Sequence, residues 1–168
     1  MSVPSTVRAA TPGDWDEIYK LFRLLHKENG MFSSSESKVD WLLERILYPE
    51  LIAQDDPGLR GFLGVIGPEG ALEAFILMVI ASYWYTDEIH LEELATFVHP
   101  NHRRSKHAHA LLQYSKHLSD ATSIPLLIGI ISNKRTEAKV RLYRKHLPET
   151  GSFFLYNAQQ GLANGEGQ

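Results

Sequence analysis

The sequence predicts an α/β domain with a central sheet and helices on both of its faces. Segments with the two-residue period of strands alternate with helical segments, in the order β-α-α-β-β-β-α-β-α-β. Residues 74–80 are continuously apolar, which is typical of a strand buried on both faces. Residues 91–112 run from an apolar strand through a basic turn into a helix. These three observations carry the fold prediction.

The N-terminal part supplies one strand and two helices. Residues 5–10 form a strand candidate, and Thr11 and Pro12 have the residue types of a helix N-cap and first helical position. Gly30 ends this helix as a C-terminal cap. A second amphipathic helix follows a serine-rich loop and closes before Pro49.

The middle of the chain predicts a hairpin. Strands are expected over residues 60–66 and 72–85, joined by a tight turn at Gly67-Pro68-Glu69-Gly70. The second strand closes on the aromatic residues 83–85. This cluster fits packing at the edge of the core, or a wall of a substrate pocket, and both interpretations stay open.

The C-terminal part continues the alternation. A buried strand is expected over residues 126–131, a helix over 136–147 and a last strand over 151–156. No linker or repeat divides the chain, so residues 1–158 are expected to form a single domain. Residues 159–168 are polar and glycine-rich and are expected to form a flexible tail.

Composition bounds the function. The chain has 168 residues, 43% hydrophobic content and a net charge of −3, values typical of a soluble globular domain. The absence of cysteine excludes disulfides, thiolate metal sites and a cysteine nucleophile. A slightly acidic total gives no general case for binding nucleic acid, so anion binding must be local. No apolar run is long enough for a membrane span or a signal peptide, and a cytoplasmic location is expected.

The basic turn predicts an anion site. A helix begins after it, and a helix start presents unpaired backbone N–H groups and partial positive charge. Arg103, Arg104 and Lys106 would add full charges, so a phosphate or pyrophosphate would suit the turn. The alternative is a solvated basic turn before a surface helix.

Three segments in order resemble the GNAT superfamily of acetyl-CoA-dependent N-acetyltransferases. Val98, Pro100, Arg103 and Ala108 match its signature, a strand ending V-x-P followed by R-x-x-G-x-G/A and a helix. The segment Leu142-Tyr143-Arg144-Lys145 is similar to the family's L-Y-x-K, and residues 7–14 to its opening strand and helix start. The resemblance covers residues 5–156.

The chain also departs from the family pattern. Lys106 stands where the first glycine of the signature is expected, although glycine permits close approach of the backbone to a pyrophosphate. A Lys can hold helical backbone angles, so the loop can persist. Asn133 is a candidate for the asparagine after the next strand, but it lies farther from Tyr143 than is usual.

The resemblance implies a mixed, mostly antiparallel sheet and acetyl-CoA as co-substrate. It implies transfer of an acetyl group to a primary amine of an unidentified small molecule, peptide or protein, by direct attack in a ternary complex. A homodimer is also implied. The alternative is a GNAT-like protein that binds acyl-CoA or a partner without catalysis. The residues expected to bind the coenzyme are Phe97, Val98, Arg103, Arg104, Ser105, Lys106, His107, Ala108 and Asn133.

The transfer needs a base for the amine and an acid for the leaving thiolate. Glu92 lies six residues before Val98, where a branch of the family carries its base, and by period two it shares a face with Thr96 and Val98. Glu93 and His90 are alternatives, because a bulge would exchange the faces. A surface glutamate is the other reading of Glu92.

Tyr143 matches the position of the family's general acid, and a core tyrosine is the alternative. The walls of the acceptor site are expected from the first two helices, the loop 29–37 and residues 83–88.

Four histidines, at 99, 102, 107 and 109, lie close together in the sequence. Imidazole is a common metal ligand. However, no nearby Cys or paired Asp completes a ligand set, and the break from strand to helix scatters the side chains. The sequence therefore predicts no metal site, and histidines that face solvent or phosphate.

Overall fold

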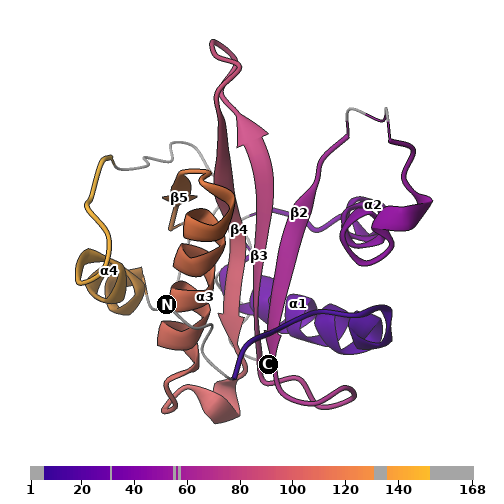
Figure 1. The fold of residues 1–168 in the computed structure, drawn as a ribbon. Coiled ribbons are helices and arrows are strands. Elements are labelled where there is room, and N and C mark those ends of the chain that lie inside the picture. Colours follow the sequence, from indigo (N-terminus) through magenta and orange to yellow (C-terminus); the bar gives the residue numbers. More distant parts are fainter. Residues whose placement is uncertain (1–5, 31, 55, 57, 131–135, 152–168) are drawn as a thin grey trace.

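The computed structural model describes residues 6–30, 32–54, 56, 58–130 and 136–151, and it has the predicted fold class (Figure 1). A five-stranded sheet has the strand order β1-β2-β3-β4-β5. The elements are β1 (Arg8–Ala9), the 3₁₀ helix η1 (Pro12–Asp14), α1 (Trp15–Asn29), α2 (Glu36–Leu47), η2 (Pro49–Leu51), β2 (Gly61–Ile66), β3 (Ala74–Ser82), β4 (Ile89–Val98), η3 (Pro100–His102), α3 (His107–Thr122), β5 (Leu126–Ile128) and α4 (Thr136–Arg144). Nearly all of the predicted last strand, 151–156, and the whole tail lie outside the described residues.

The sheet is mostly antiparallel, as the resemblance implied. Strands β1 to β4 pair antiparallel in order, and β5 joins β4 in parallel. Strand β3 is central, and residues from Ala74 to Val79 are almost completely buried. This confirms the burial on both faces that the apolar run predicted.

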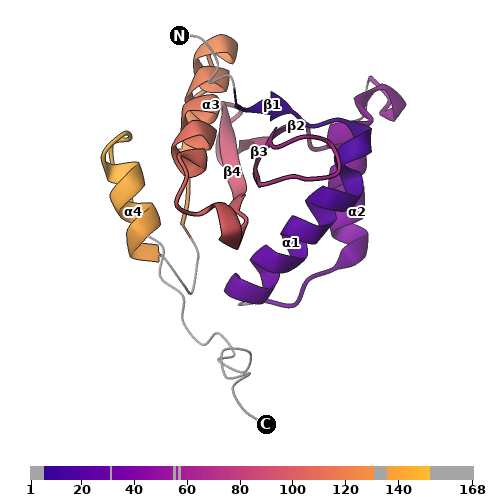
Figure 2. The same ribbon diagram turned by 90° about the horizontal axis from the view of Figure 1, so that it is seen from below.

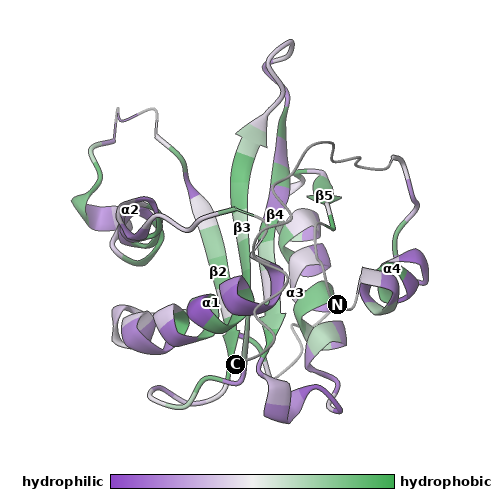
Figure 3. Cartoon of the chain, turned by 180° about the vertical axis from the view of Figure 1, so that it is seen from behind, coloured by the Kyte–Doolittle hydropathy of each residue, from purple (hydrophilic) through white to green (hydrophobic). Residues whose placement is uncertain are grey.

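Helices cover both faces of the sheet (Figures 1 and 2). Helices α1 and α2 contribute Ile18, Leu21 and Leu43 to a cluster that includes Phe75 of β3. Helix α3 packs on the opposite face, where Leu111 joins a second cluster. Figure 3 shows largely apolar strands between helices that carry both hydrophilic and hydrophobic residues. No helix of the described residues is both long and apolar enough to cross a membrane.

The connection from β2 to β3 is longer than the predicted tight turn, because β3 begins at Ala74 and not at Leu72. Gly67 and Gly70 have φ values of 107° and 82°, which only glycine adopts at low cost. Residues 67–72 therefore form a loop between the two strands. The loop is closed by a hydrogen bond of 2.8 Å from the Glu73 N–H to the Ile66 carbonyl.

The start of the first helix is anchored by a buried ion pair. The helical segment begins with η1 after Thr11, as predicted. The Asp14 carboxylate is fully buried and accepts hydrogen bonds from Arg8 Nη1 and Nη2 at 2.7 and 2.8 Å. It also accepts the Thr11 N–H at 2.8 Å. The Arg8 guanidinium thereby lowers the pKa of Asp14 from its ordinary value.

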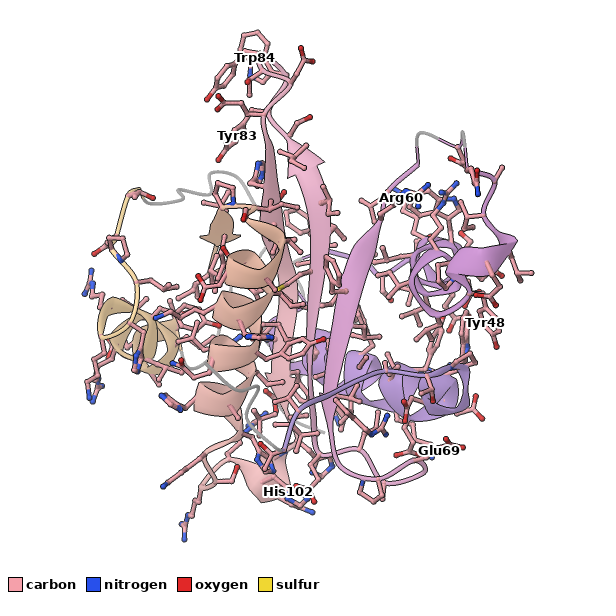
Figure 4. All side chains as sticks on the ribbon, in the orientation of Figure 1. Tyr48, Arg60, Glu69, Tyr83, Trp84 and His102 are labelled. Atoms are coloured by element: carbon pink, nitrogen blue, oxygen red, sulfur yellow. The ribbon has the colours of Figure 1, made fainter. Side chains whose placement is uncertain are left out.

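The aromatic residues 83–85 do not lie at the edge of the core, which was one of the two positions expected for them. They form the tip of the β3–β4 hairpin, where Trp84 is 95% exposed, and this tip projects beyond the helices (Figure 4). Tyr83 and Tyr85 stack on each other, with ring centroids 5.6 Å apart. The cluster does not pack at the core edge, because the hairpin is longer than the helices that cover the sheet.

Two further elements are shorter than predicted. Of the strand expected over 126–131, whose last residue lies outside the described part of the chain, Leu126–Ile128 pair with β4. They are half-buried at the edge of the sheet that the described residues form. The last helix ends at Arg144, and residues 145–147 continue as a hydrogen-bonded turn.

Candidate active site

A bulge in β4 sets which side chains reach the site. Leu77 of β3 pairs with Ala95, but its neighbour Met78 pairs with Glu93. Leu94 therefore has no partner in the β3 ladder and forms the extra residue of the bulge.

The bulge exchanges the faces of the two neighbouring glutamates. Glu93 and Thr96 pair with Met78 and Ile76, which belong to the cluster packed against α3. Glu92 falls on the opposite face, toward α1 and α2. The inference that Glu92 shares a face with Thr96 and Val98 is therefore wrong, since two-residue periodicity fails across a bulge.

The pairing between strands β4 and β5 ends next to the bulge at Leu94. Their parallel ladder runs from Leu91↔Leu126 to Glu93↔Ile128, and β4 continues to Val98 without a described partner on this side. Glu93 thus stands where the two strands begin to diverge.

A large cavity of about 660 Å³ opens on one side of this point. It is lined by α1, α2, the segment between them, β4, β5 and α4, including His26, Phe32, Lys38, Leu42, Glu92 and Glu93. The first two helices and the loop between them, which were expected to wall the acceptor site, line this cavity. Residues 83–88, which were expected to contribute to the same walls, are not among its lining.

A smaller cavity of about 190 Å³ lies between the end of β4, the loop before α3, α1 and α4. Five of the residues expected to bind the coenzyme line it: Phe97, Val98, Arg103, Ser105 and Ala108. Arg104 and Lys106 are exposed on the loop, and His107 is half-buried outside the lining. Asn133 lies outside the described residues.

The two cavities meet at Asn29, Thr96, Lys139 and Tyr143, which line both. Lys139 Nζ donates to the Thr96 carbonyl at 3.4 Å. At this junction, the Asn29 Oδ1 atom is buried without a hydrogen-bond partner among the described residues. Buried polar atoms are rarely left unpaired in a native protein, so this oxygen favours a polar ligand at the junction.

Glu93 and Tyr143 have shifted pKa values at this junction. Burial raises the pKa of Glu93 to about 7, although the Lys139 ammonium opposes the rise. Burial also raises the pKa of Tyr143 above its ordinary value, and the Glu93 charge adds to that shift. Near neutral pH, Glu93 can therefore exchange a proton while Tyr143 keeps its own.

Glu92 has a different environment. Its side chain is 43% exposed, and its Oε2 lies 3.7 Å from His90 Nε2. Like Glu93, it lines the larger cavity and not the smaller one. The His90 ring in turn stacks against Tyr83 at 4.9 Å. Glu92 is thus partly exposed, whereas the His90 side chain is only 12% exposed and packs against Tyr83.

Arg103 is not a free positive charge. Its Nη2 contacts both Glu28 carboxylate oxygens, at 2.5 and 2.6 Å, and its Nε donates to the Val98 carbonyl at 3.2 Å. The guanidinium also lies over the Phe97 ring, 5.5 Å from its centroid. The sequence could not reveal this pairing, because Glu28 is 75 residues away.

The backbone of Lys106 does not adopt a left-handed conformation. It is the N-cap of α3, with φ −88° and ψ 12°, angles that any L-residue adopts. The expectation that a lysine can stand at the glycine position is confirmed for the backbone.

Thr96 was not predicted as a member of the site, Lys139 was not placed beside Tyr143, and Asn29 was expected only as the start of the loop 29–37. Lys139 precedes Tyr143 by four residues, one helical turn, so helical spacing could have placed both on the same face. No comparable signal marks Asn29 or Thr96.

Comparison with known proteins agrees with this architecture. No protein-family model and no curated protein sequence matches the chain. Among solved structures, it is similar to a ribosomal-protein-alanine N-acetyltransferase from Brucella melitensis biovar Abortus 2308, with a TM-score of 0.62, 15% identity, and coverage of 89% of this chain and 96% of that one.

It is also similar to AAC(6')-Iy in complex with the bisubstrate analogue CoA-S-monomethyl-acetylneamine, with a TM-score of 0.65, 14% identity, and coverage of 89% and 95%. An aminoglycoside 6'-N-acetyltransferase from Acinetobacter haemolyticus gives a TM-score of 0.61 at 14% identity, with coverage of 89% and 95%. At these identities the likeness concerns the fold, and the chain has the GNAT fold that these acetyltransferases share.

Proposed function

We propose that the protein is an N-acetyltransferase that uses acetyl-CoA and acetylates a primary amine. The observation that carries the proposal is the junction of two cavities at Asn29, Thr96, Lys139 and Tyr143, beside the raised pKa of Glu93. Two substrates that enter from different cavities would meet at this junction. Perturbed carboxyl groups in a cleft are typical of catalytic sites.

The smaller cavity is the proposed coenzyme side. The first backbone N–H groups of α3, a helix of sixteen residues, suit a pyrophosphate, and Ser105 lies on the loop before them. The unpaired Asn29 Oδ1 can accept a hydrogen bond from an amide of the coenzyme's pantetheine arm. These features fit acetyl-CoA, and the CoA-derived ligand of AAC(6')-Iy supports the same choice.

The larger cavity is the proposed acceptor side. Two of the similar proteins are named as acetyltransferases of a ribosomal-protein alanine and of an aminoglycoside, and both of these substrates present an amine. The lining of this cavity, with its serines at 33–35, His26 and Lys38, does not select one amine. We therefore propose the class, a primary amine, and no particular molecule.

Three groups of this chain would serve the transfer. The Glu93 carboxylate accepts a proton from the attacking amine, for which a pKa of about 7 is well matched at neutral pH. The Tyr143 hydroxyl gives its proton to the leaving thiolate. The bulge leaves Leu94 outside the β3 ladder, so its backbone N–H is the candidate donor for an oxyanion at the point of divergence.

The alternative of a non-catalytic protein rested on Lys106 in place of glycine and on the open choice of the base, for which we propose Glu93. Because Lys106 holds an ordinary backbone conformation at the N-cap of α3, the departure from glycine gives no reason to expect loss of the coenzyme. We therefore do not adopt that alternative.

Calorimetric titration with acetyl-CoA and with CoA tests the coenzyme side. Wild type is compared with Ala108→Trp, which fills the smaller cavity, and with Ala121→Trp, an exposed position on the same helix. We expect saturable binding by wild type and by Ala121→Trp, and a loss of at least about tenfold for Ala108→Trp, or about 1.4 kcal/mol. Absence of binding by wild type would refute the proposal.

An amine panel tests the chemistry once binding is established. Release of free thiol from acetyl-CoA is followed with small amines, polyamines, aminoglycosides and peptides with free N-termini. We expect turnover with at least one amine class. If the protein binds acetyl-CoA but acetylates no member, the non-catalytic alternative gains the support that it lacks here.

A further inference from the structure

Three potential metal ligands converge at the end of the sheet beside the loop before α3. Glu73 lies just before β3, His102 ends η3 and His107 begins α3. Glu73 Oε2 is 3.2 Å from His102 Nδ1 and 2.5 Å from His107 Nε2. All three ligand atoms lie within 4.8 Å of one another. Figure 4 places His102 at the end of the molecule opposite Trp84.

The backbone holds these side chains in place. The Glu73 N–H bonds the Ile66 carbonyl, and the Glu73 carbonyl accepts the His99 N–H, both at 2.8 Å. The Ser105 hydroxyl donates to the His102 carbonyl at 2.5 Å and accepts the His107 N–H at 3.2 Å. The three residues thus come from segments whose relative positions are fixed without a metal.

The spacing of the ligand atoms is close to that of a zinc site. In a tetrahedral site with bonds of about 2.1 Å, neighbouring ligand atoms lie about 3.4 Å apart. The distance from Glu73 to His102 already matches this value, and the distance from Glu73 to His107 needs an opening of about 1 Å. Glu73 and His102 are 31% and 39% exposed, which leaves room for that adjustment.

The donor set indicates the kind of ion. Imidazole nitrogens suit Zn²⁺ and neighbouring transition metals, whereas Mg²⁺ and Ca²⁺ prefer ligand sets made of oxygen. Two histidines and one carboxylate are a known zinc set that keeps a fourth position open.

We propose that Glu73, His102 and His107 form a binding site for Zn²⁺ or a similar divalent transition metal. The sequence did not predict it, because Glu73 lies just before β3, 29 residues ahead of His102, and supplies the carboxylate that the histidine cluster lacked. A bound ion would join the two ends of the loop 103–106 to the start of β3. The site goes beyond the proposed transfer and does not depend on it.

Zinc titration of untagged, chelator-treated protein tests the site. Calorimetry with Zn²⁺ is combined with Co²⁺ titration, in which a tetrahedral site gives intense visible absorption. Wild type is compared with Glu73→Gln and His107→Ala, and with His109→Ala as a matched control. His109 is on the same helix, but its ring packs against His146 and lies outside the cluster.

We expect one equivalent of Zn²⁺ at micromolar or tighter affinity, and at least about tenfold weaker binding in the two cluster variants. His109→Ala should bind as wild type does. Far-UV circular dichroism confirms that each variant is folded, and a Glu73→Asp variant extends the test if Glu73→Gln is not. No saturable binding by wild type, or equal losses in the cluster variants and in His109→Ala, would overturn the proposal. The titration uses no acetyl-CoA, so its failure is distinct from failure of the proposed transfer.

Discussion

Glu92 and Glu93 are neighbours in sequence with opposite environments. Glu92 is partly exposed in the larger cavity, whereas burial raises the pKa of Glu93 to about 7. A base that is half-deprotonated near neutral pH combines a useful ionised fraction with sufficient basicity. The structure thus gives a reason to prefer Glu93 for the role that sequence analysis assigned to Glu92.

This preference predicts a pH profile. For wild type, kcat/KM should rise with pH up to about 7 and then level off, because only the ionised Glu93 accepts a proton. Glu93→Gln should lower kcat by about 10²- to 10⁴-fold and abolish the rising limb. The measurement is the initial rate of thiol release between pH 5.5 and pH 9. This range extends about 2 pH units above the expected pKa of Glu93.

Glu92→Gln is the matched control, since it makes the same change one residue away on the opposite face. It should keep the rising limb and most of kcat. A profile that disappears in Glu92→Gln and persists in Glu93→Gln would restore Glu92 as the base.

Tyr143→Phe tests the acid separately. It removes only the hydroxyl that faces the junction, so kcat should fall by about tenfold or more, within the range of acid catalysis, while acetyl-CoA affinity stays unchanged. A loss confined to affinity would mean that Tyr143 only forms part of the cavity wall.

At the scale of elements, the ion pair between Glu28 and Arg103 joins the end of α1 to the loop before α3. Both residues line the smaller cavity, so Glu28 places a negative charge where an anionic coenzyme is expected. Glu28→Gln should therefore tighten CoA binding by about three- to tenfold, or roughly 1 kcal/mol, as measured by calorimetry.

Arg103 keeps its bond to the Val98 carbonyl and its contact with Phe97 in that variant, so the loop should hold its position. Glu36→Gln removes a carboxylate that pairs with Arg23 and lines neither cavity, and it should leave the affinity unchanged. Weaker binding in Glu28→Gln would show that the ion pair supports the loop more than it repels the coenzyme.

The sequence predicted those elements whose signals are local. Pro12 after Thr11 marked the first helix, and the apolar run of β3 indicated helices on both faces. The bulge at Leu94 was not predictable, since the pairing between β3 and β4 decides it and no residue type in β4 requires it. The same reason hid Glu28 and Glu73, whose partners lie far along the chain.

At the scale of the whole molecule, α1 and α2 cover one face of the sheet and α3 covers the other (Figure 2). The junction takes residues from α1, β4 and α4, so its geometry depends on how α1 is held to the sheet. The buried pair of Arg8 and Asp14 ties β1 to the start of the first helical segment. Removing one partner of a buried ion pair costs about 3–5 kcal/mol, and exposure of the Arg8 side chain reduces this to about 2–3 kcal/mol.

Asp14→Asn should lower the free energy of unfolding by about that amount at pH 7, as measured by urea denaturation. The folded-state pKa of Asp14 lies below its ordinary value of 3.8, so its contribution is complete above that value and disappears as pH falls through the folded-state pKa. The difference between wild type and Asp14→Asn should therefore be constant from pH 7 to about pH 5 and shrink below pH 4. Asp120→Asn changes an exposed carboxylate on α3 and should stay within about 0.5 kcal/mol of wild type. A difference that grows at low pH would contradict the lowered pKa, because the pair would then be most stabilising when Asp14 is protonated.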